Sequence, residues 1–129
     1  MNIKVLIDFD ILGDYKTNRK LFDENLETLR MLLKIYGVEL FISSKDVEFF
    51  VSLKVSSDNL NIILEENLND KEKFITDIST KYEWVLYFKN GTKNIECNRN
   101  IVYSLIDLKG DIDKFNNISF TEHARNKKY

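Results

Sequence analysis

The sequence predicts an α/β fold: a mostly parallel five-stranded sheet with helices on both faces. Two observations predict it. Short apolar runs alternate with amphipathic runs along the chain, which is the pattern of strand, helix and strand repeated. The first apolar run is nearly continuous in Ile, Val, Leu and Phe, as expected for a strand buried on both faces. Because no linker, repeat or low-complexity segment divides the 129 residues, we expect a single domain over 1–129.

The apolar runs mark the expected strands, which are Ile3 to Phe9, Val38 to Ser43, Leu60 to Leu64, Trp84 to Phe88 and Ile101 to Ile106. Helical spacing predicts helices over Leu21 to Tyr36, with Gly37 as the stop, over Asp46 to Val55, and from Asn69 to about Tyr82. Asn69 and Glu72 have the spacing of a capping box. A short polar helix is expected from Gly91 to about Asn98 and a small closing element from Asp111, with a frayed tail over about 121–129.

Composition excludes several classes of protein. The net charge of −2 shows no excess of basic residues, so nucleic acid is not an expected partner. Cys97 is the only cysteine and His123 the only histidine, which excludes an internal disulfide and argues against a structural zinc site. The N-terminal apolar run lacks the features of a signal peptide, and no run is long enough to span a bilayer. We therefore expect a cytoplasmic protein without a membrane partner.

Two carboxylates end the first predicted strand in the stretch VLIDFD. If the extended geometry persists, Asp8 and Asp10 project to the same side, at the edge of the sheet where ligands collect in α/β folds. Neighbouring carboxylates repel unless a cation lies between them, and Mg²⁺ prefers oxygen ligands. With a phosphate held nearby, one carboxylate can attack phosphorus while the other carries a proton. The alternative is that Asp10 caps the following turn and Asp8 merely ends a strand.

Four stretches, in order, resemble motifs of the haloacid dehalogenase-like (HAD) phosphohydrolases, and the resemblance covers roughly residues 2 to 108. VLIDFD resembles the first motif, with Asp8 at the nucleophile position and Asp10 at the acid/base position. GVELFISSKD resembles the second, which places Ser43 where the family hydrogen-bonds the phosphate. In NDKEKF, Lys71 matches the lysine that neutralises the phosphoryl group best, with Lys73 as a rival.

The fourth motif departs from the family. WVLYFKNGTKNIE aligns Asn90 and Asn94 with two acids of the motif. The resemblance implies a Rossmann-like sheet, phosphomonoester hydrolysis through an aspartyl-phosphate, and Mg²⁺ bound by Asp8, Asp10 and Asn90. Because asparagine offers a carbonyl oxygen but no negative charge, we expect weakened Mg²⁺ binding. The chain is then either a slow phosphatase or a fold kept for binding after catalysis was lost.

Only about ten residues, LGDYKTNRKL, separate the first motif from the next predicted helix. The family often inserts a lid domain at this position, and here there is no room for one. An uncovered site could accept a large phosphorylated substrate, such as a phosphoprotein or a nucleic-acid end, or another subunit of a homo-oligomer could close it.

Two other readings remain open. DFDILGDY also looks like the start of the PIN-type ribonucleases, in which Asp8, Glu48 and Asp70 would bind a divalent metal for phosphodiester cleavage; the acid expected after the fourth strand is missing. The third reading is a non-enzymatic interaction module. Its partner surface could include some of six aromatic side chains, although aromatic residues at strand or helix spacing are far more often core: Phe49, Phe50, Tyr82, Trp84, Tyr87 and Tyr103.

Overall fold

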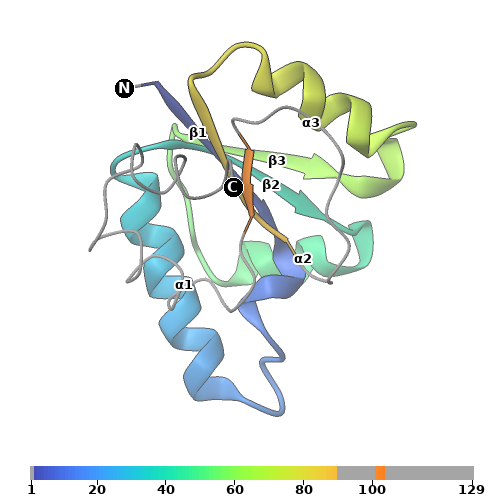
Figure 1. Cartoon of the computed structure of the whole chain (residues 1–129). Helices are drawn as coiled ribbons and strands as arrows, with labels where there is room; N and C mark the ends of the chain where they lie inside the picture. The colour runs from blue at the N-terminus through green and yellow to red at the C-terminus, as the bar shows by residue number, and fades with distance from the viewer. Residues whose placement is uncertain (1, 90–100, 104–129) are drawn as a thin grey trace.

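The computed structural model describes residues 2–89 and 101–103, and it alternates strands and helices as the sequence predicts (Figure 1). Its strands are β1 (Ile3–Asp8), β2 (Gly37–Ile42), β3 (Leu60–Leu64), β4 (Trp84–Phe88) and β5 (Ile101–Tyr103). Its helices are α1 (Arg19–Leu33), α2 (Ser44–Ser52) and α3 (Lys71–Ser79), with short 3₁₀ turns η1 (Phe9–Leu12) and η2 (Glu65–Asn67).

The strands form a parallel sheet in the order β3-β2-β1-β4-β5. The α/β fold with a parallel sheet is therefore confirmed. The fifth strand is present only as the three residues Ile101–Tyr103 at the edge beside β4, so the full-length strands of the described sheet are β1 to β4. The remainder of the predicted run, 104–106, lies outside the described residues, as do the expected polar helix, the closing element and the tail over 121–129.

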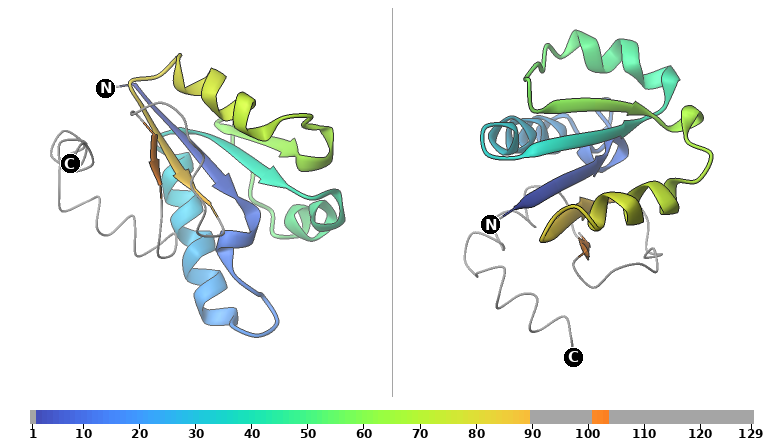
Figure 2. Two further views of the ribbon diagram at one scale, coloured as in Figure 1. Left: turned by 45° about the vertical axis from the view of Figure 1, so that its right-hand side comes forward. Right: turned by 90° about the horizontal axis from the view of Figure 1, so that it is seen from above.

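Helices cover both faces of the sheet, as predicted, and each face has its own core. On one face, residues of α1 and α2 pack against alternate residues of the strands, such as Val5 and Ile7 of β1. On the other face, Ile75 of α3 packs against Leu6, Phe41 and Tyr87. The right-hand view of Figure 2 shows α2 and α3 on opposite sides of the strands. The central strand β1 is thus buried on both faces, which explains its nearly continuous apolar sequence.

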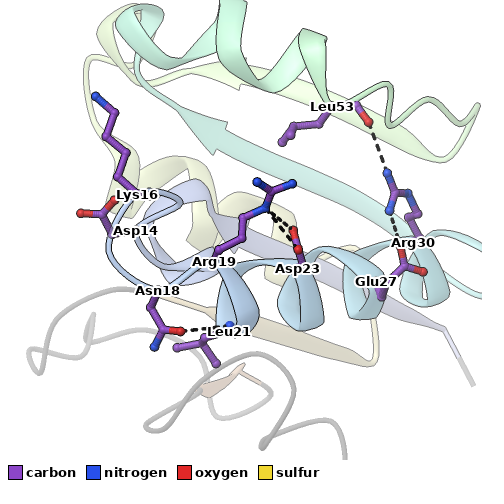
Figure 3. A network of polar contacts seen from close by, with 9 residues as sticks. All are labelled: Asp14, Lys16, Asn18, Arg19, Leu21, Asp23, Glu27, Arg30 and Leu53. Carbon is purple, nitrogen blue, oxygen red and sulfur yellow. Dashed lines mark hydrogen bonds and ion pairs between the residues drawn. The ribbon is translucent and has the colours of Figure 1, made fainter.

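The first helix begins and ends earlier than its apolar spacing predicts. Asn18, which sequence analysis did not single out, caps α1 by accepting a hydrogen bond from the Leu21 backbone N–H (Figure 3). The helix ends at Leu33 rather than Tyr36, and Gly37 is the first residue of β2 instead of a helix stop. A Cβ at Gly37 would lie 3.2 Å from the Lys4 ammonium, which would have to move by a few tenths of an ångström.

The cap of the third helix also differs from the prediction. Asp70, not Asn69, is the N-cap of α3, and its carboxylate accepts a hydrogen bond from the Lys73 backbone N–H at 3.0 Å. The predicted capping box between Asn69 and Glu72 was therefore wrong by one residue. The correct assignment makes Lys71 the first residue of the helix. The second helix begins at Ser44, two residues before the predicted start.

None of the helices in the described part of the chain has the length and apolar character needed to cross a lipid bilayer.

Candidate functional site

The strand order places a topological switch point between β1 and β4. From β1 the chain adds β2 and β3 on one side, and then crosses to the other side of β1 to add β4. In open α/β sheets the crevice at such a point, beyond the carboxyl ends of the strands, is where ligands bind. Asp8 is the last residue of β1, so it lies at this edge.

Asp8 is held by groups from two other elements. Its Oδ1 accepts a hydrogen bond from the Tyr87 hydroxyl of β4 at 2.8 Å. The same oxygen accepts a hydrogen bond from Lys71 Nζ at 2.9 Å, and the two charged groups form an ion pair. Asp8 is only 9% exposed, and a buried carboxylate is costly without such partners. Asp8 therefore does more than end a strand, because its carboxylate joins β1, β4 and the start of α3.

Lys71 has further contacts that fix its ammonium group. Nζ lies 3.3 Å from Glu65 Oε1 and 4.6 Å from the centre of the Phe41 ring, a cation–π distance. The rival candidate Lys73 is exposed, and its described hydrogen bond is the backbone one to Asp70. Of the two lysines, the structure thus brings Lys71 to Asp8.

Asp10 differs from Asp8 in exposure because the extended geometry does not persist. The chain turns into η1 at Phe9, so Asp10 becomes exposed while Asp8 stays buried. The prediction that both carboxylates project to one side of a continuing strand was conditional on extended backbone, and that condition fails.

Asp10 and Ser43 line one cleft of about 260 Å³ at the start of α2. Phe41 and Glu65, which contact Lys71, line the same cleft. The structure therefore gathers the four predicted catalytic residues in two adjoining pairs, Asp8 with Lys71 and Asp10 with Ser43. The cleft is predominantly acidic, since its charged lining residues are Asp10, Asp46, Glu65, Glu66 and Lys45.

Glu66 is a residue that sequence analysis missed. Its carboxylate oxygens accept hydrogen bonds from the Ser44 backbone N–H at 2.9 and 3.1 Å, so an anionic side chain already occupies the N-terminus of α2. The hydrogen bond from the Ser44 backbone is the main cause that lowers the pKa of the Glu66 carboxyl below its ordinary value. The pair of glutamates directly after the third apolar run was the available signal.

Lys89 is a second missed residue. It directly follows β4 and is only 7% exposed. The register aligns Ile7 with Phe88, the residues just before Asp8 and Lys89, so the backbones at Asp8 and Lys89 reach the same edge of the sheet. A lysine immediately after an apolar run was the signal in the sequence.

Only part of the predicted Mg²⁺ site lies within the described residues. Among residues 2–89 and 101–103, no three or more His, Cys, Asp or Glu side chains are placed to hold a metal ion. Of the predicted ligands, Asp8 is bound to a lysine, Asp10 is exposed, and Asn90 lies outside the described residues together with Asn94. The expected Mg²⁺ stays a prediction.

The acids of the PIN-type reading do not form a cluster either. Asp8, Glu48 and Asp70 are all described, yet they do not make a metal-binding group. Asp70 caps α3 and Glu48 is exposed on α2.

The aromatic residues proposed as a partner surface are mostly packed. Phe50 and Tyr87 are buried, and Phe49, Tyr82 and Trp84 are half-buried. The side chain of Tyr103 lies outside the described part of the chain.

Comparisons of the chain with protein-family models, with curated proteins and with solved structures find no match. The fold and the side chains at the switch point are therefore what indicates a function for this chain.

Proposed function

We propose that this chain is a HAD-like phosphohydrolase with a Rossmann-like sheet, which hydrolyses phosphomonoesters through an aspartyl-phosphate on Asp8. The observation that supports it most directly is the Asp8–Lys71 ion pair at the switch point of the sheet. The resemblance assigns these two residues the roles of nucleophile and of phosphate-neutralising cation.

The proposed reaction has two steps. A carboxylate oxygen of Asp8 attacks phosphorus, the bond from phosphorus to the leaving-group oxygen breaks, and Asp10 donates a proton to that oxygen. Water then attacks the phosphorus of the acyl phosphate, Asp10 takes a proton from it, and the Asp8 carboxylate is released with inorganic phosphate. Lys71 offsets the negative charge of the phosphoryl group, while Tyr87 and Lys71 orient the Asp8 carboxyl group.

Turnover is slow in this proposal because Glu66 competes with the substrate. The resemblance places the phosphate beside Ser43, at the start of α2, where the Glu66 carboxylate is bound to the Ser44 backbone. A phosphate that binds there displaces Glu66 and faces the other acids of the cleft. Mg²⁺ would supply additional positive charge at this site.

The same observation favours a second candidate, a non-enzymatic binding module that keeps the fold but has lost turnover. In either case no lid domain is inserted between η1 and α1, because in the described part of the chain only the loop over 13–18 connects them. A macromolecular phosphorylated substrate and a second subunit covering the site both remain part of the proposal.

The deciding experiment measures hydrolysis of p-nitrophenyl phosphate with Mg²⁺ and with EDTA. We expect slow hydrolysis that Asp8→Asn abolishes and that Asp77→Asn, an exposed acid on α3, leaves unchanged. Lys71→Gln lowers kcat/KM at least about tenfold, as for loss of one charge-stabilising donor, whereas Lys73→Gln does not. Phosphate binding without any Asp8-dependent hydrolysis selects the binding module, and Asp70-dependent cleavage of single-stranded RNA overturns both in favour of the nuclease.

A further inference from the structure

A second and larger pocket adjoins the candidate site. It has a volume of about 470 Å³ and lies between the loop after η1 and α2. Asp10 and Asp46 line both this pocket and the cleft that contains Ser43. A molecule that places its phosphoryl group near Ser43 can therefore extend past Asp10 into the second pocket.

The walls of this pocket are aromatic. Tyr15 and Phe49 are half-buried and meet edge to face with ring centres 5.1 Å apart, and Phe22 packs against both rings from α1. Phe9 of η1 completes the wall behind Phe49, and the centres of these two rings are 6.4 Å apart. Rings fixed in this way offer a preformed surface for another flat apolar group.

The rim of the pocket is acidic. Its charged lining residues are the carboxylates of Asp10, Asp14 and Asp46 and the ammonium of Lys16. The Lys16 backbone N–H donates to Asp14 at 2.8 Å, which lowers the pKa of the Asp14 carboxyl. Arg19, whose guanidinium lies 4.2 Å from the centre of the Tyr15 ring, does not offset this charge, because it is paired with Asp23 (Figure 3). Aromatic walls with carboxylates at the rim suit an aromatic group that carries a positive charge.

We propose that this pocket binds a cationic aromatic group, namely an arylalkylamine in its ammonium form. A second part of this inference rests on the proposed function: the cationic aromatic group is the leaving group of the phosphomonoester. Asp10 lies between the two pockets, so it can donate its proton to the bridging oxygen as that bond to phosphorus breaks.

The test uses ligand-observed NMR with the full chain and three probes: tyramine, 4-ethylphenol, which lacks the ammonium group, and butylamine, which lacks the ring. Tyramine is expected to bind at least about fivefold more tightly than either of the others. Phe49→Ala weakens tyramine binding about fivefold, and Asp46→Asn weakens tyramine but not 4-ethylphenol. Val51→Ala, at an exposed position of the same helix, changes neither. Circular dichroism verifies that each variant is folded. If Phe49→Ala unfolds the chain, Asp46→Asn still tests the pocket, because Asp46 is a half-buried residue at its rim.

The outcomes separate this inference from the proposed function. Hydrolysis of p-nitrophenyl phosphate that needs Asp8, together with no saturable tyramine binding, overturns the pocket and keeps the phosphohydrolase. Tyramine binding that needs Asp46, without any hydrolysis, keeps the pocket and overturns the phosphohydrolase. If both hold, tyramine O-phosphate is hydrolysed with a kcat/KM at least about fivefold above that of 4-ethylphenyl phosphate, and Asp46→Asn removes the difference. Equal binding of tyramine and 4-ethylphenol overturns the cationic part of the proposal.

Discussion

Individual polar contacts at the carboxyl edge of the sheet have consequences for stability as well as for chemistry. Asp8 and Lys71 are both partly shielded from water, with side-chain exposures of 13% and 30%. An ion pair in such surroundings contributes little net stability when intact, but removing one partner leaves the other charge poorly solvated. This asymmetry makes the pair testable by unfolding experiments that do not depend on activity.

Replacing Lys71 is expected to destabilise the fold. We predict that Lys71→Gln lowers the free energy of unfolding by about 1–3 kcal/mol, because it removes the ammonium group that lies 2.9 Å from the Asp8 carboxylate. Lys73→Gln, at an exposed position, changes it by less than about 0.5 kcal/mol. Urea unfolding measures both, and equal effects would contradict the pairing.

Glu66 is expected to respond to pH. Its pKa in the folded protein is lowered from the ordinary value of 4.5, so its contribution to stability is fully present above 4.5 and is lost as the pH falls through the lower folded value. The stability difference between the wild type and Glu66→Gln should therefore shrink on acidification below 4.5. Thermal unfolding over a pH series measures it, with Glu72→Gln as the exposed control.

Glu66 should also limit anion binding at α2. We predict that Glu66→Ala increases the affinity for inorganic phosphate several-fold, because it frees the Ser44 backbone N–H and removes a like charge. Titration followed by ³¹P NMR measures the affinity. Unchanged affinity would show that phosphate does not bind at the start of α2.

At the scale of elements, the ends of helices position the candidate residues. The cap at Asp70 sets Lys71 as the first residue of α3, and packing of Ile75 and Phe74 against the sheet holds that helix in place. The turn η1 places Asp10 at an exposed position where it lines both pockets.

The corrected cap yields a matched pair of variants. Asp70→Ala should lower the free energy of unfolding by about 1 kcal/mol, because it removes the acceptor of the Lys73 backbone N–H. Asn69→Ala should have an effect below about 0.5 kcal/mol. Chemical denaturation compares the two variants. A larger effect of Asn69→Ala would support the predicted Asn69–Glu72 capping box instead of the cap at Asp70.

At the scale of the whole molecule, two helical layers enclose a parallel sheet, and the switch point lies between its central strands (Figure 1). The two pockets and the Asp8–Lys71 pair all lie near the ends of β1 and β2. The architecture thus concentrates groups from separate segments of the chain at one place, as open α/β sheets do in general.

Much of this arrangement was predictable from local patterns. The positions of the strands and the approximate positions of α1, α2 and α3 followed from apolar periodicity. The burial of β1 on both faces followed from its continuous apolar run. Asp8 and Lys71 were predicted as site residues, and the structure places them in contact. Helix ends were predicted less accurately, since Asn18 and Asp70 act through backbone hydrogen bonds that leave only a weak trace in the sequence.

The sequence by itself determined the layered α/β fold, because burial of alternating apolar runs is a local property that each segment carries in its own residues. Only the tertiary structure decided which polar groups meet: Lys71 with Asp8, Glu66 with the start of α2, and Asp10 with an aromatic pocket. These contacts join residues far apart in the chain, so they depend on the order of the strands and on a few backbone turns. Charge and hydrogen bonding act over distances of a few ångströms, and sequence spacing does not specify distances of that size between separate elements.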